Sequence, residues 1–442
     1  MTPAASVPKA TLADTMALAT DVLIPFAARG PIARRPRITT LSERMDADRR
    51  AVRRMQRVRD RYGPGPVLLK FPRRDLAMVL ASQHVHRILN GSPDPFATAN
   101  LEKRQALSHF QPHGVLISEP AERADRRPFN EEVLDNPNPI HHMAADFIPK
   151  IRQEADVLVR HARNAGRLTW DDFIVAWWRT VRRVYLGDGA RDDHALTDML
   201  TELRHDANFS YLKPKRKGLN ERFLRQLQGH LDRAEPGSLA ALIAQAPTTH
   251  VTKPAQQVPQ WLFASDPAGI AAIRALALLV AHPEQLERVR ADLDGRDLDT
   301  PQDLPLLRCA VLESLRLWPT TPAILRDTTT QTRWETGILP AAAGLVIFAP
   351  LFHRDDRTLP YANSFAPDIW LEDRTDKDWP LVPFSGGPGM CPGRNLVLLT
   401  TTTMLASLVA ALPLHLDPPD ALLEGEPLPG TYSPYNLVFS TS

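Results

Sequence analysis

The most constraining feature of this chain is the long apolar segment 258–282, which ends directly before Pro283. A helix over this segment is hydrophobic nearly all round, so we expect it to run through the interior of the fold. The 442 residues provide enough chain for a large core around it. A second apolar helix is predicted from about Arg394 to Leu412. Apolar periodicity predicts further helices at 16–28, 42–62, 120–135, 145–163, 168–186, 194–207 and 301–318, and short strands at 67–71, 334–337 and 344–349.

Helix dominates this prediction, so the expected fold class is mainly α with a small β region. The sequence contains no internal repeat and no linker long enough to separate domains, so residues 1–442 are expected to form a single large domain. Within it, we interpret residues 1–40 as a segment that packs on the body. The 41 prolines break the chain into many segments, and the stretch 353–390 is expected to be irregular.

The composition excludes several classes of protein. Lys plus Arg is 53 and Asp plus Glu is 51, and the net charge of +2 argues against a nucleic-acid binder that relies on bulk positive charge. The two cysteines, Cys309 and Cys391, exclude a disulfide framework and a four-cysteine zinc site. The apolar stretch 16–28 is interrupted by Asp21 and Pro25 and falls short of the ~20 residues that a membrane span needs. Because no signal-peptide pattern is present either, we expect a cytoplasmic protein without a membrane span.

One of the cysteines lies in a glycine-rich loop directly before the second apolar helix. The loop, residues 383–394, reads Pro-Phe-Ser-Gly-Gly-Pro-Gly-Met-Cys-Pro-Gly-Arg. A cysteine near a helix N-terminus lies beside partial positive charge and free backbone N–H groups, which stabilise its thiolate. Glycines let the backbone approach a flat cofactor, and a thiolate held in this way is a good axial ligand for heme iron. From these residues alone, Cys391 is a heme ligand, a buried structural cysteine or a nucleophile.

This loop resembles the heme-binding loop of the cytochrome P450 family, Phe-x-x-Gly-x-Arg/His-x-Cys-x-Gly. Phe384, Gly387, Cys391 and Gly393 match the pattern at the correct spacing. The resemblance implies that these four residues bind heme b and that the Cys391 thiolate is the axial ligand of its iron. Gly389 departs from the pattern, because the family usually has Arg or His there to reach a heme propionate.

A Glu-x-x-Arg pair lies about 75 residues upstream, at Glu313 and Arg316. Positions three apart share one face of a helix, so the pair points one way. Its surroundings resemble the family's K-helix, where the pair fixes the irregular segment behind the heme and has a structural role. The third member of that network is usually an arginine, but Ile369 stands in its place. Our hypothesis is that Arg354 takes over this role.

Two further arginines match positions that contact heme propionates in the family. Arg326 follows Arg316 by ten residues, and its guanidinium fork suits a carboxylate. Arg126 matches the arginine of the family's C-helix, although Glu122 stands where that helix usually has histidine. The alternative interpretation of Arg126 is a solvated charge run.

The segment 261–269 resembles the family's oxygen-activating I-helix, with one unusual feature. Asp266 supplies the acid that relays protons, but Pro267 and Ala268 follow it where a threonine is usual. Pro267 removes one backbone N–H, so the helix is expected to kink or open there. Ser265 is the nearby hydroxyl that could replace the threonine. Alternatively, Asp266 only satisfies the kinked backbone.

The resemblance also places Ala264 against the cofactor and several residues near the substrate. Phe263, Asn208, Phe209 and Ile324 are the candidate substrate-pocket residues. Core packing is an equally good interpretation of each of them.

Taken together, the motifs agree in order and spacing over residues 120–412, and they imply the cytochrome P450 fold. The implied activity is that of a heme-thiolate monooxygenase, which inserts oxygen from O2 into a small organic substrate. No fused flavin reductase fits in this length, so the expected electron donors are a separate ferredoxin and ferredoxin reductase. The absence of a membrane anchor indicates a bacterial-type enzyme, which we associate with secondary metabolism.

Two alternatives remain open at this point. The missing threonine favours a heme-thiolate enzyme that uses peroxide, or that catalyses coupling, rearrangement or nitrogen oxidation. The departures at Glu122, Ile369 and Gly389 favour a non-catalytic heme-binding protein on a degenerate scaffold.

Overall fold

A computed structural model describes residues 6–72, 74–372, 381–418, 422 and 425–441. Its helices are α1 Leu12–Leu18, α2 Ile24–Ala28, α3 Pro36–Arg44, α4 Ala47–Tyr62, α5 Ser82–Asn90, α6 Leu101–Leu107, α7 Pro120–Val133, α8 Ala144–Ala165, α9 Trp170–Leu186, α10 His194–Ala207, α11 Lys217–Arg233, α12 Leu239–Gln245, α13 Val258–Ala281, α14 Pro283–Leu293, α15 Pro305–Leu317, α16 Ala349–His353 and α17 Arg394–Ala411. The strands are β1 Val67–Leu69, β2 Leu76–Met78, β3 Phe96–Ala97, β4 Arg167–Thr169, β5 Ala323–Thr328, β6 Thr332–Trp334, β7 Gly337–Leu339, β8 Gly344–Phe348, β9 His415–Asp417 and β10 Val438–Ser440. The predicted class, mainly α with a small β region, is confirmed.

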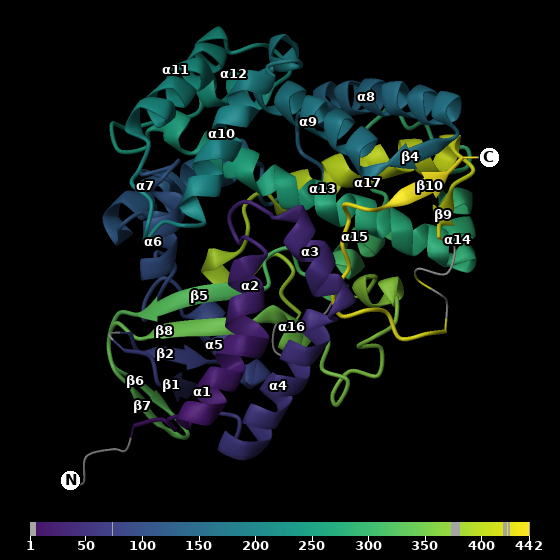
Figure 1. Cartoon of the computed structure of the whole chain (residues 1–442). Coiled ribbons are helices and arrows are strands. Elements are labelled where there is room, and N and C mark those ends of the chain that lie inside the picture. Colours follow the sequence, from purple (N-terminus) through teal and green to yellow (C-terminus); the bar gives the residue numbers. More distant parts are fainter. Residues whose placement is uncertain (1–5, 73, 373–380, 419–421, 423–424, 442) are drawn as a thin grey trace.

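The predicted apolar helix is α13, which crosses the helical part of the molecule and packs against α9, α15 and α17 (Figure 1). Its apolar residues and those of α17 belong to one large hydrophobic core. By length and composition alone, 254–281 and Arg394–Ala411 could each cross a membrane, but 72% of the apolar window in each is buried inside the fold. Both are therefore accounted for as core helices.

Four consecutive threonines lie inside the apolar helix α17, and their hydroxyls explain how they are tolerated there. Thr400, Thr401, Thr402 and Thr403 each donate a side-chain hydrogen bond to the carbonyl four residues earlier, at 2.7 to 2.9 Å. The polar groups are thus satisfied within the helix and can be buried.

The β region is a five-stranded sheet with the order β1-β2-β8-β5-β3. It encloses a second hydrophobic core together with residues of the N-terminal helices and of α5. Strand β5 runs antiparallel to β8, with Arg326 opposite Leu345. Figure 1 shows this sheet and the helices α1, α2, α4 and α5 in one part of the molecule, and α8 to α13 with α17 in the other.

Several predicted boundaries are wrong for local reasons. The segment 42–62 is broken, because Asp46 adopts a left-handed conformation between α3 and α4. The predicted strand 334–337 contains the turn of the β6–β7 hairpin, in which Trp334 pairs with Gly337. The irregular stretch 353–390 contains two short 3-10 turns, and its residues 373–380 lie outside the described residues.

Candidate cofactor site

Cys391 lies between the 3-10 turn Gly387–Gly389 and the start of α17. Its backbone N–H donates to the Phe384 carbonyl at 3.0 Å, which closes the loop. Burial raises the pKa of the Cys391 thiol, while a hydrogen bond from the Gly393 backbone N–H and the charges of Arg127 and Arg394 act in the opposite direction. The sulfur therefore has the N–H donor and the positive surroundings that the sequence predicted.

Gly387 is fixed by its close packing and its backbone conformation. Its φ is +58°, and a Cβ there would lie 2.4 Å from the Leu89 carbonyl oxygen. A larger residue would have to displace the backbone of α5. This explains why the loop needs glycine at the position that matches the family pattern.

Gly389 has a different reason to be glycine. A Cβ at this position would lie 2.7 Å from Nη2 of Arg326, so the Arg326 guanidinium occupies the space of the side chain that is usual in the pattern. Arg326 donates to the Ser92 hydroxyl at 2.9 Å and to the Leu325 carbonyl at 3.0 Å. The departure from the pattern therefore brings a second predicted site residue close to the cysteine loop.

Arg326 belongs to a group of three cations, which we call the loop cations: the buried Arg123 and Arg326 and the partly buried Lys103. Lys103 Nζ donates to the carbonyls of Thr98 and Leu325, both at 2.9 Å, and Arg123 Nη2 donates to Pro388 of the cysteine loop at 3.3 Å. Burial and the Arg123 charge lower the pKa of Arg326 to about 10, and burial and the Arg326 charge lower that of Lys103.

The loop cations fit the two propionates of a heme. In the described residues, no carboxylate makes a hydrogen bond or ion pair with any of the three. Two buried polar atoms beside them, Arg123 Nη1 and Thr98 Oγ1, have no partner either. Asp327 and Glu102 act on Lys103, and Glu131 acts on Arg123, only through space. A pair of carboxylates in direct contact would therefore satisfy both the cations and the two unbonded atoms.

The sequence prediction included Arg326 but not Lys103 or Arg123. Arg123 could have been found from the sequence, because it lies one helical turn before the predicted site residue Arg126.

The structure does not bring Arg126 to the cysteine loop. Its guanidinium donates to Glu122 at 2.9 and 3.2 Å, to the Ser118 hydroxyl at 2.7 Å and to the Val251 carbonyl at 3.0 Å. Two residues of the predicted C-helix pattern thus form an ion pair with each other. The neighbouring Arg127 reaches the loop instead, through the Met390 carbonyl at 2.8 Å.

Glu313 and Arg316 form a completely buried ion pair on α15. Arg316 also donates to four backbone carbonyls, those of His353, Tyr361, Ala362 and Ser364. The Glu313 carboxylate accepts from the Ala366 N–H and from the Trp370 indole N–H, both at 2.8 Å. The pair therefore ties α15 to the irregular segment that precedes the cysteine loop.

Trp370, not Arg354, is the third side chain of this network. Arg354 donates to Asn363 and to the carbonyls of Leu317, Leu428 and Pro429, and it does not reach Glu313. The indole N–H lies one residue after the position where arginine was expected, which is why the sequence pattern missed it.

His353, next to this network, gives a prediction for the effect of pH on stability. Its Nε2 accepts a hydrogen bond from the Val382 N–H at 2.9 Å, and burial together with the Arg316 charge lowers its pKa from 6.5 to about 3. The folded protein thus holds this ring neutral. Its contribution is complete above about pH 6.5 and is lost as the pH falls towards 3, at up to about 1.4 kcal/mol per pH unit.

We therefore expect His353→Gln, which keeps an acceptor for the Val382 N–H but cannot titrate, to reduce the acid dependence of stability. The free energy of unfolding, measured by urea denaturation between about pH 7 and about pH 5, should fall less steeply in the variant than in the wild type. Equal slopes in the two proteins would contradict the assignment.

On α13, Asp266 forms an ion pair with Arg204 of α10 at 2.8 Å. The single O–H of Ser265 donates to the Trp261 carbonyl at 3.0 Å, and its oxygen lies 3.1 Å from the Tyr185 hydroxyl, within hydrogen-bond distance. Because α9 carries Tyr185, the hydroxyl of Ser265 is directed to α9 and away from the Asp266 carboxylate. Burial raises the pKa of Tyr185 to about 12, so it remains a neutral partner.

Pro267 does not end the helix, which continues to Ala281. The Ser265 carbonyl accepts a hydrogen bond from the Trp177 indole at 2.7 Å, and a Cβ on Gly269 would lie 2.8 Å from that ring. The Trp177 indole therefore packs against α13 at the segment that contains Pro267 and Gly269. Because Pro267 has no N–H, the carbonyl that loses its helical donor is that of Phe263, four residues earlier, and the Trp177 bond to Ser265 is a separate contact between α9 and α13.

The candidate pocket residues divide into two groups. Phe263 packs edge-to-face on Phe110, with ring centroids 5.8 Å apart, and lies under the Arg204 guanidinium at 4.9 Å, so it is next to the Asp266 pair. It and Ala264 are partly buried, as residues facing a ligand would be. By contrast, Ile324 is buried in the core of the sheet.

Asn208 and Phe209 hold the N-terminal segment in place. The Asn208 amide accepts from the Ile32 N–H at 3.0 Å and donates to the Ala33 carbonyl at 2.7 Å. Phe209 is 42% exposed and carries the Arg35 guanidinium 4.6 Å above its ring. Both side chains are therefore accounted for by contacts with residues 32–35.

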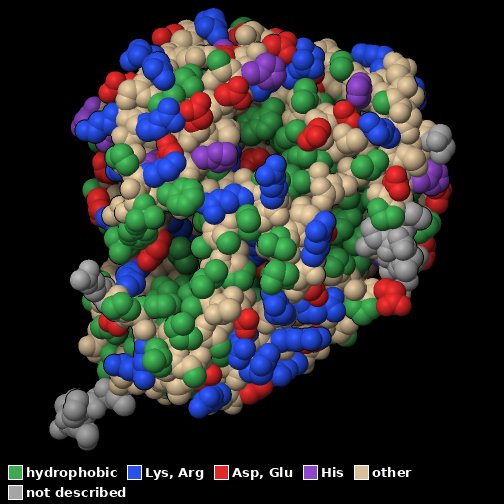
Figure 2. Space-filling model, viewed as in Figure 1, with side chains coloured by type: hydrophobic (Ala, Val, Ile, Leu, Met, Phe, Trp, Pro, Cys, Tyr) green, Lys and Arg blue, Asp and Glu red, His purple; other side chains and the backbone are tan. Residues whose placement is uncertain are grey.

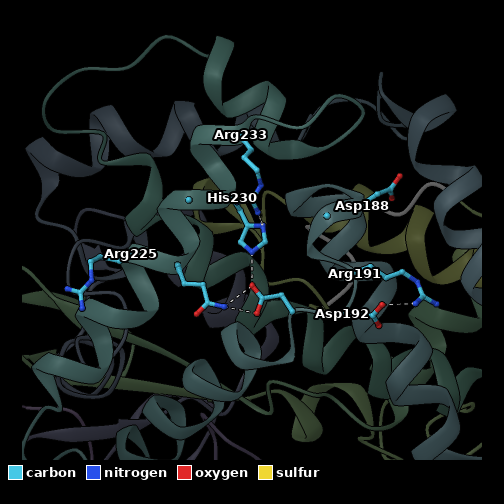
Figure 3. Close-up of a pocket in the computed structure, with 10 residues that line it drawn as sticks. Asp188, Arg191, Asp192, Arg225, His230 and Arg233 are labelled. Carbon is cyan, nitrogen blue, oxygen red and sulfur yellow. Dashed lines mark hydrogen bonds and ion pairs between the residues drawn. The ribbon is translucent and has the colours of Figure 1, made fainter.

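An open pocket of about 690 Å³ lies elsewhere, between the start of α10 and α11 (Figure 3). Its polar groups satisfy one another: Asp193 accepts from His230 at 2.7 Å and from Gln226 at 2.6 Å, and Arg233 donates to the other ring nitrogen of His230. This network joins α10 to α11, and we assign it no ligand.

Comparisons with known proteins find similarity in the part of the chain that contains Glu313, Arg326 and Cys391. Residues 248–431 match the family model for cytochrome P450. The chain is similar to cyclooctat-9-en-7-ol 5-monooxygenase of Streptomyces melanosporofaciens, with 34% identity over 143 residues, or 30% of this chain and 31% of that protein. Cytochrome P450 4c3 of Drosophila melanogaster is 31% identical over 166 residues, or 35% of this chain and 31% of that protein. The chain thus spans about a third of the length of the curated relatives it matches.

Among solved structures, the chain resembles the crystal structure of a cytochrome P450 (CYP102L1). The TM-score is 0.69 with 16% sequence identity, over 88% of this chain and 97% of that chain. At this identity the likeness concerns the fold.

Proposed function

We propose that this chain, which has the cytochrome P450 fold and the family's sequence features over residues 248–431, is a heme-thiolate monooxygenase. The observation that carries the proposal is the Cys391 sulfur, with the Gly393 N–H donating to it, in a loop that also contacts the loop cations. The carbon monoxide difference spectrum of the reduced protein tests it, because a thiolate-ligated heme has a characteristic band.

The residues of the site would divide the work as follows. Cys391 would hold the heme iron, and the loop cations would hold the propionates. When bound, the heme supplies dioxygen activation and oxygen insertion into a C–H bond. The chain itself would orient the substrate beside Phe263, exclude water through the apolar face of α13, and pass protons through the Asp266 carboxylate once it leaves its ion pair with Arg204.

We further propose a separate ferredoxin, reduced by a ferredoxin reductase, as the electron donor, in the cytoplasm of a bacterium. Positive charge near Cys391 supports this: among the described residues, Arg394 at the start of α17 has no carboxylate partner, whereas Arg127 and Arg308 beside it are paired with Glu131 and Asp303. Such a region would attract an acidic partner and accelerate its association.

A second candidate, peroxide-driven turnover, is favoured by one observation on α13. Asp266 is followed by Pro267, and the nearby Ser265 hydroxyl is engaged with Tyr185, so no alcohol stands beside the acid. Proton delivery to reduced oxygen then depends on Asp266, which must leave its ion pair with Arg204.

The two routes predict different effects of Asp266→Asn. If electrons come from ferredoxin, we expect the variant to lower turnover about 10²-fold, as loss of a proton-transfer group does, and to lower peroxide-driven turnover much less. Product formation is measured once with ferredoxin plus NAD(P)H and once with hydrogen peroxide. The substrate is a compound selected because it shifts the heme absorption.

The control is Asp206→Asn, which breaks the ion pair with Lys213 instead. Equal losses with both oxidants would argue against proton delivery by Asp266. Heme binding without turnover by either route would support the non-catalytic alternative.

A further inference from the structure

A second group of arginines lies on the side of α13 that faces the N-terminal segment. Arg34 precedes α3, Arg204 lies on α10 and Arg274 on α13. Arg34 donates to the Thr320 carbonyl and Arg274 to the carbonyls of Trp318 and Tyr432, whose rings stack 4.8 Å apart, so both arginines lie beside the C-terminal loop that carries Tyr435. The charges of all three arginines act on the Tyr435 phenol. The chain between α2 and α3 overlaps α13 in the view of Figure 1. Arg204 of α10 joins the two, since it donates to the Ile32 carbonyl at 2.9 Å and pairs with Asp266 of α13 at 2.8 Å.

Two arginines of this region are neutralised by carboxylates. Arg204 pairs with Asp266 at 2.8 Å, and Arg29 pairs with Asp48 through two bonds of 2.6 Å. The positive charge of each is therefore balanced locally.

The other two arginines have only backbone carbonyls as hydrogen-bond partners. Arg34 donates to Gly30 at 3.4 Å and to Thr320, which lies just before β5. Arg274 is 7% exposed, donates to the Trp318 carbonyl at 3.3 Å and to Tyr432, and its Nε has no partner. Among the described residues, neither arginine is within ion-pair distance of a carboxylate. The Glu43 carboxylate, like the Tyr435 phenol, raises the pKa of Arg274 through space. Burial raises the pKa of Glu43 itself, which disfavours its negative charge.

Arg34 and Tyr435 are only partly buried, and the Tyr435 hydroxyl makes no hydrogen bond to any described residue. Guanidinium groups remain charged at neutral pH even when burial lowers their pKa. The region therefore offers an unpaired guanidinium and a free hydroxyl donor beside Asp266, which Arg204 already neutralises.

We propose that Arg34 and the Tyr435 hydroxyl bind a carboxylate of the substrate, so that the enzyme acts on small organic acids. A guanidinium donates two parallel hydrogen bonds to a carboxylate, and the phenol adds a third donor. The inference rests on the proposed function, because it assigns the substrate class of the same site. It uses other contacts than the loop cations, because Arg34 bonds to Gly30 and Thr320, whereas Arg326 bonds to Ser92 beside the cysteine loop.

The test uses the heme-loaded protein and the straight-chain acids from butanoate to dodecanoate, each with its primary amide. Dissociation constants come from the shift of the heme absorption and, independently of heme, from equilibrium dialysis. We expect one or more acids to bind about tenfold more tightly than the matched amide, as the gain of a charge-assisted pair implies. Equal affinity of acid and amide at every chain length overturns the proposal.

Variants then locate the effect. Arg34→Gln should weaken acid binding about tenfold and leave amide binding unchanged, and Tyr435→Phe should weaken it by a smaller factor. Arg34→Lys, which keeps the charge but loses the fork, should lie in between and serves if the glutamine variant does not fold. The control is Arg37→Gln, an exposed arginine of α3, which should change neither constant. Equal losses for acid and amide in Arg34→Gln contradict the proposal. A missing thiolate-type band refutes the proposed function, whereas dialysis still reports on the carboxylate site.

Discussion

Cys391→Ser is expected to abolish the thiolate-type band in the carbon monoxide difference spectrum and to remove most of the bound heme. The hydroxyl of serine is a poor ligand for heme iron, whereas the thiolate is stabilised here by the Gly393 N–H and by nearby arginines. Because burial alone raises the thiol pKa, the bare site opposes ionisation. Iron coordination would reverse that balance, since a metal-bound thiol is deprotonated. The measurement is heme content per chain together with the reduced carbon monoxide spectrum.

The chain provides its own control for this substitution in Cys309, the other cysteine. Cys309 is buried on α15, and burial raises its pKa to about 12, so it is an inert neutral thiol. Cys309→Ser should keep heme content and spectrum, although it buries a hydroxyl. A thiolate-type band that survives Cys391→Ser, or that is lost only in Cys309→Ser, would refute the assignment of the axial ligand.

The elements that the sequence predicted well are those whose physical cause is local. The helix 258–282 follows from a run of apolar residues, and the loop around Cys391 follows from glycines that lie within ten positions of one another. Gly387 illustrates this, because its φ of +58° and the nearby Leu89 carbonyl leave room for glycine alone. Such constraints are visible in a single segment.

The parts that were missed depend on residues brought together by the tertiary fold. Asp266 pairs with Arg204, which is 62 positions away, and no sequence pattern in either segment predicts that contact. The same is true of Lys103, whose ammonium reaches Leu325 across 222 positions. For Glu313, the sequence pattern required an arginine and the fold supplies the Trp370 indole, because a carboxylate accepts an N–H from either.

Glu313→Gln is expected to lower the free energy of unfolding by about 3–5 kcal/mol, because it leaves the Arg316 charge buried without its counter-ion. Both side chains are completely inaccessible to solvent, so water cannot replace the lost partner. Trp370→Phe, which removes one neutral donor to the same carboxylate, should cost about 1.5–3 kcal/mol. Urea denaturation of the heme-free and heme-loaded protein, followed by far-ultraviolet circular dichroism, measures both effects.

A matched control exists in α14, where Glu287 and Arg290 repeat the same Glu-x-x-Arg spacing with an ion pair of 2.7 Å. Those side chains are 68% and 35% exposed, so Glu287→Gln should change the free energy of unfolding by less than about 1 kcal/mol. The two pairs share sequence spacing and helix geometry. They differ in burial, in the second hydrogen bond between Arg316 and the Glu313 carboxylate, and in the backbone carbonyls that Arg316 reaches. If the two substitutions cost the same, the buried pair does not fix the segment before Cys391. If they differ as expected, the function of the motif depends on its place in the fold, since its letters and spacing are equal in both helices.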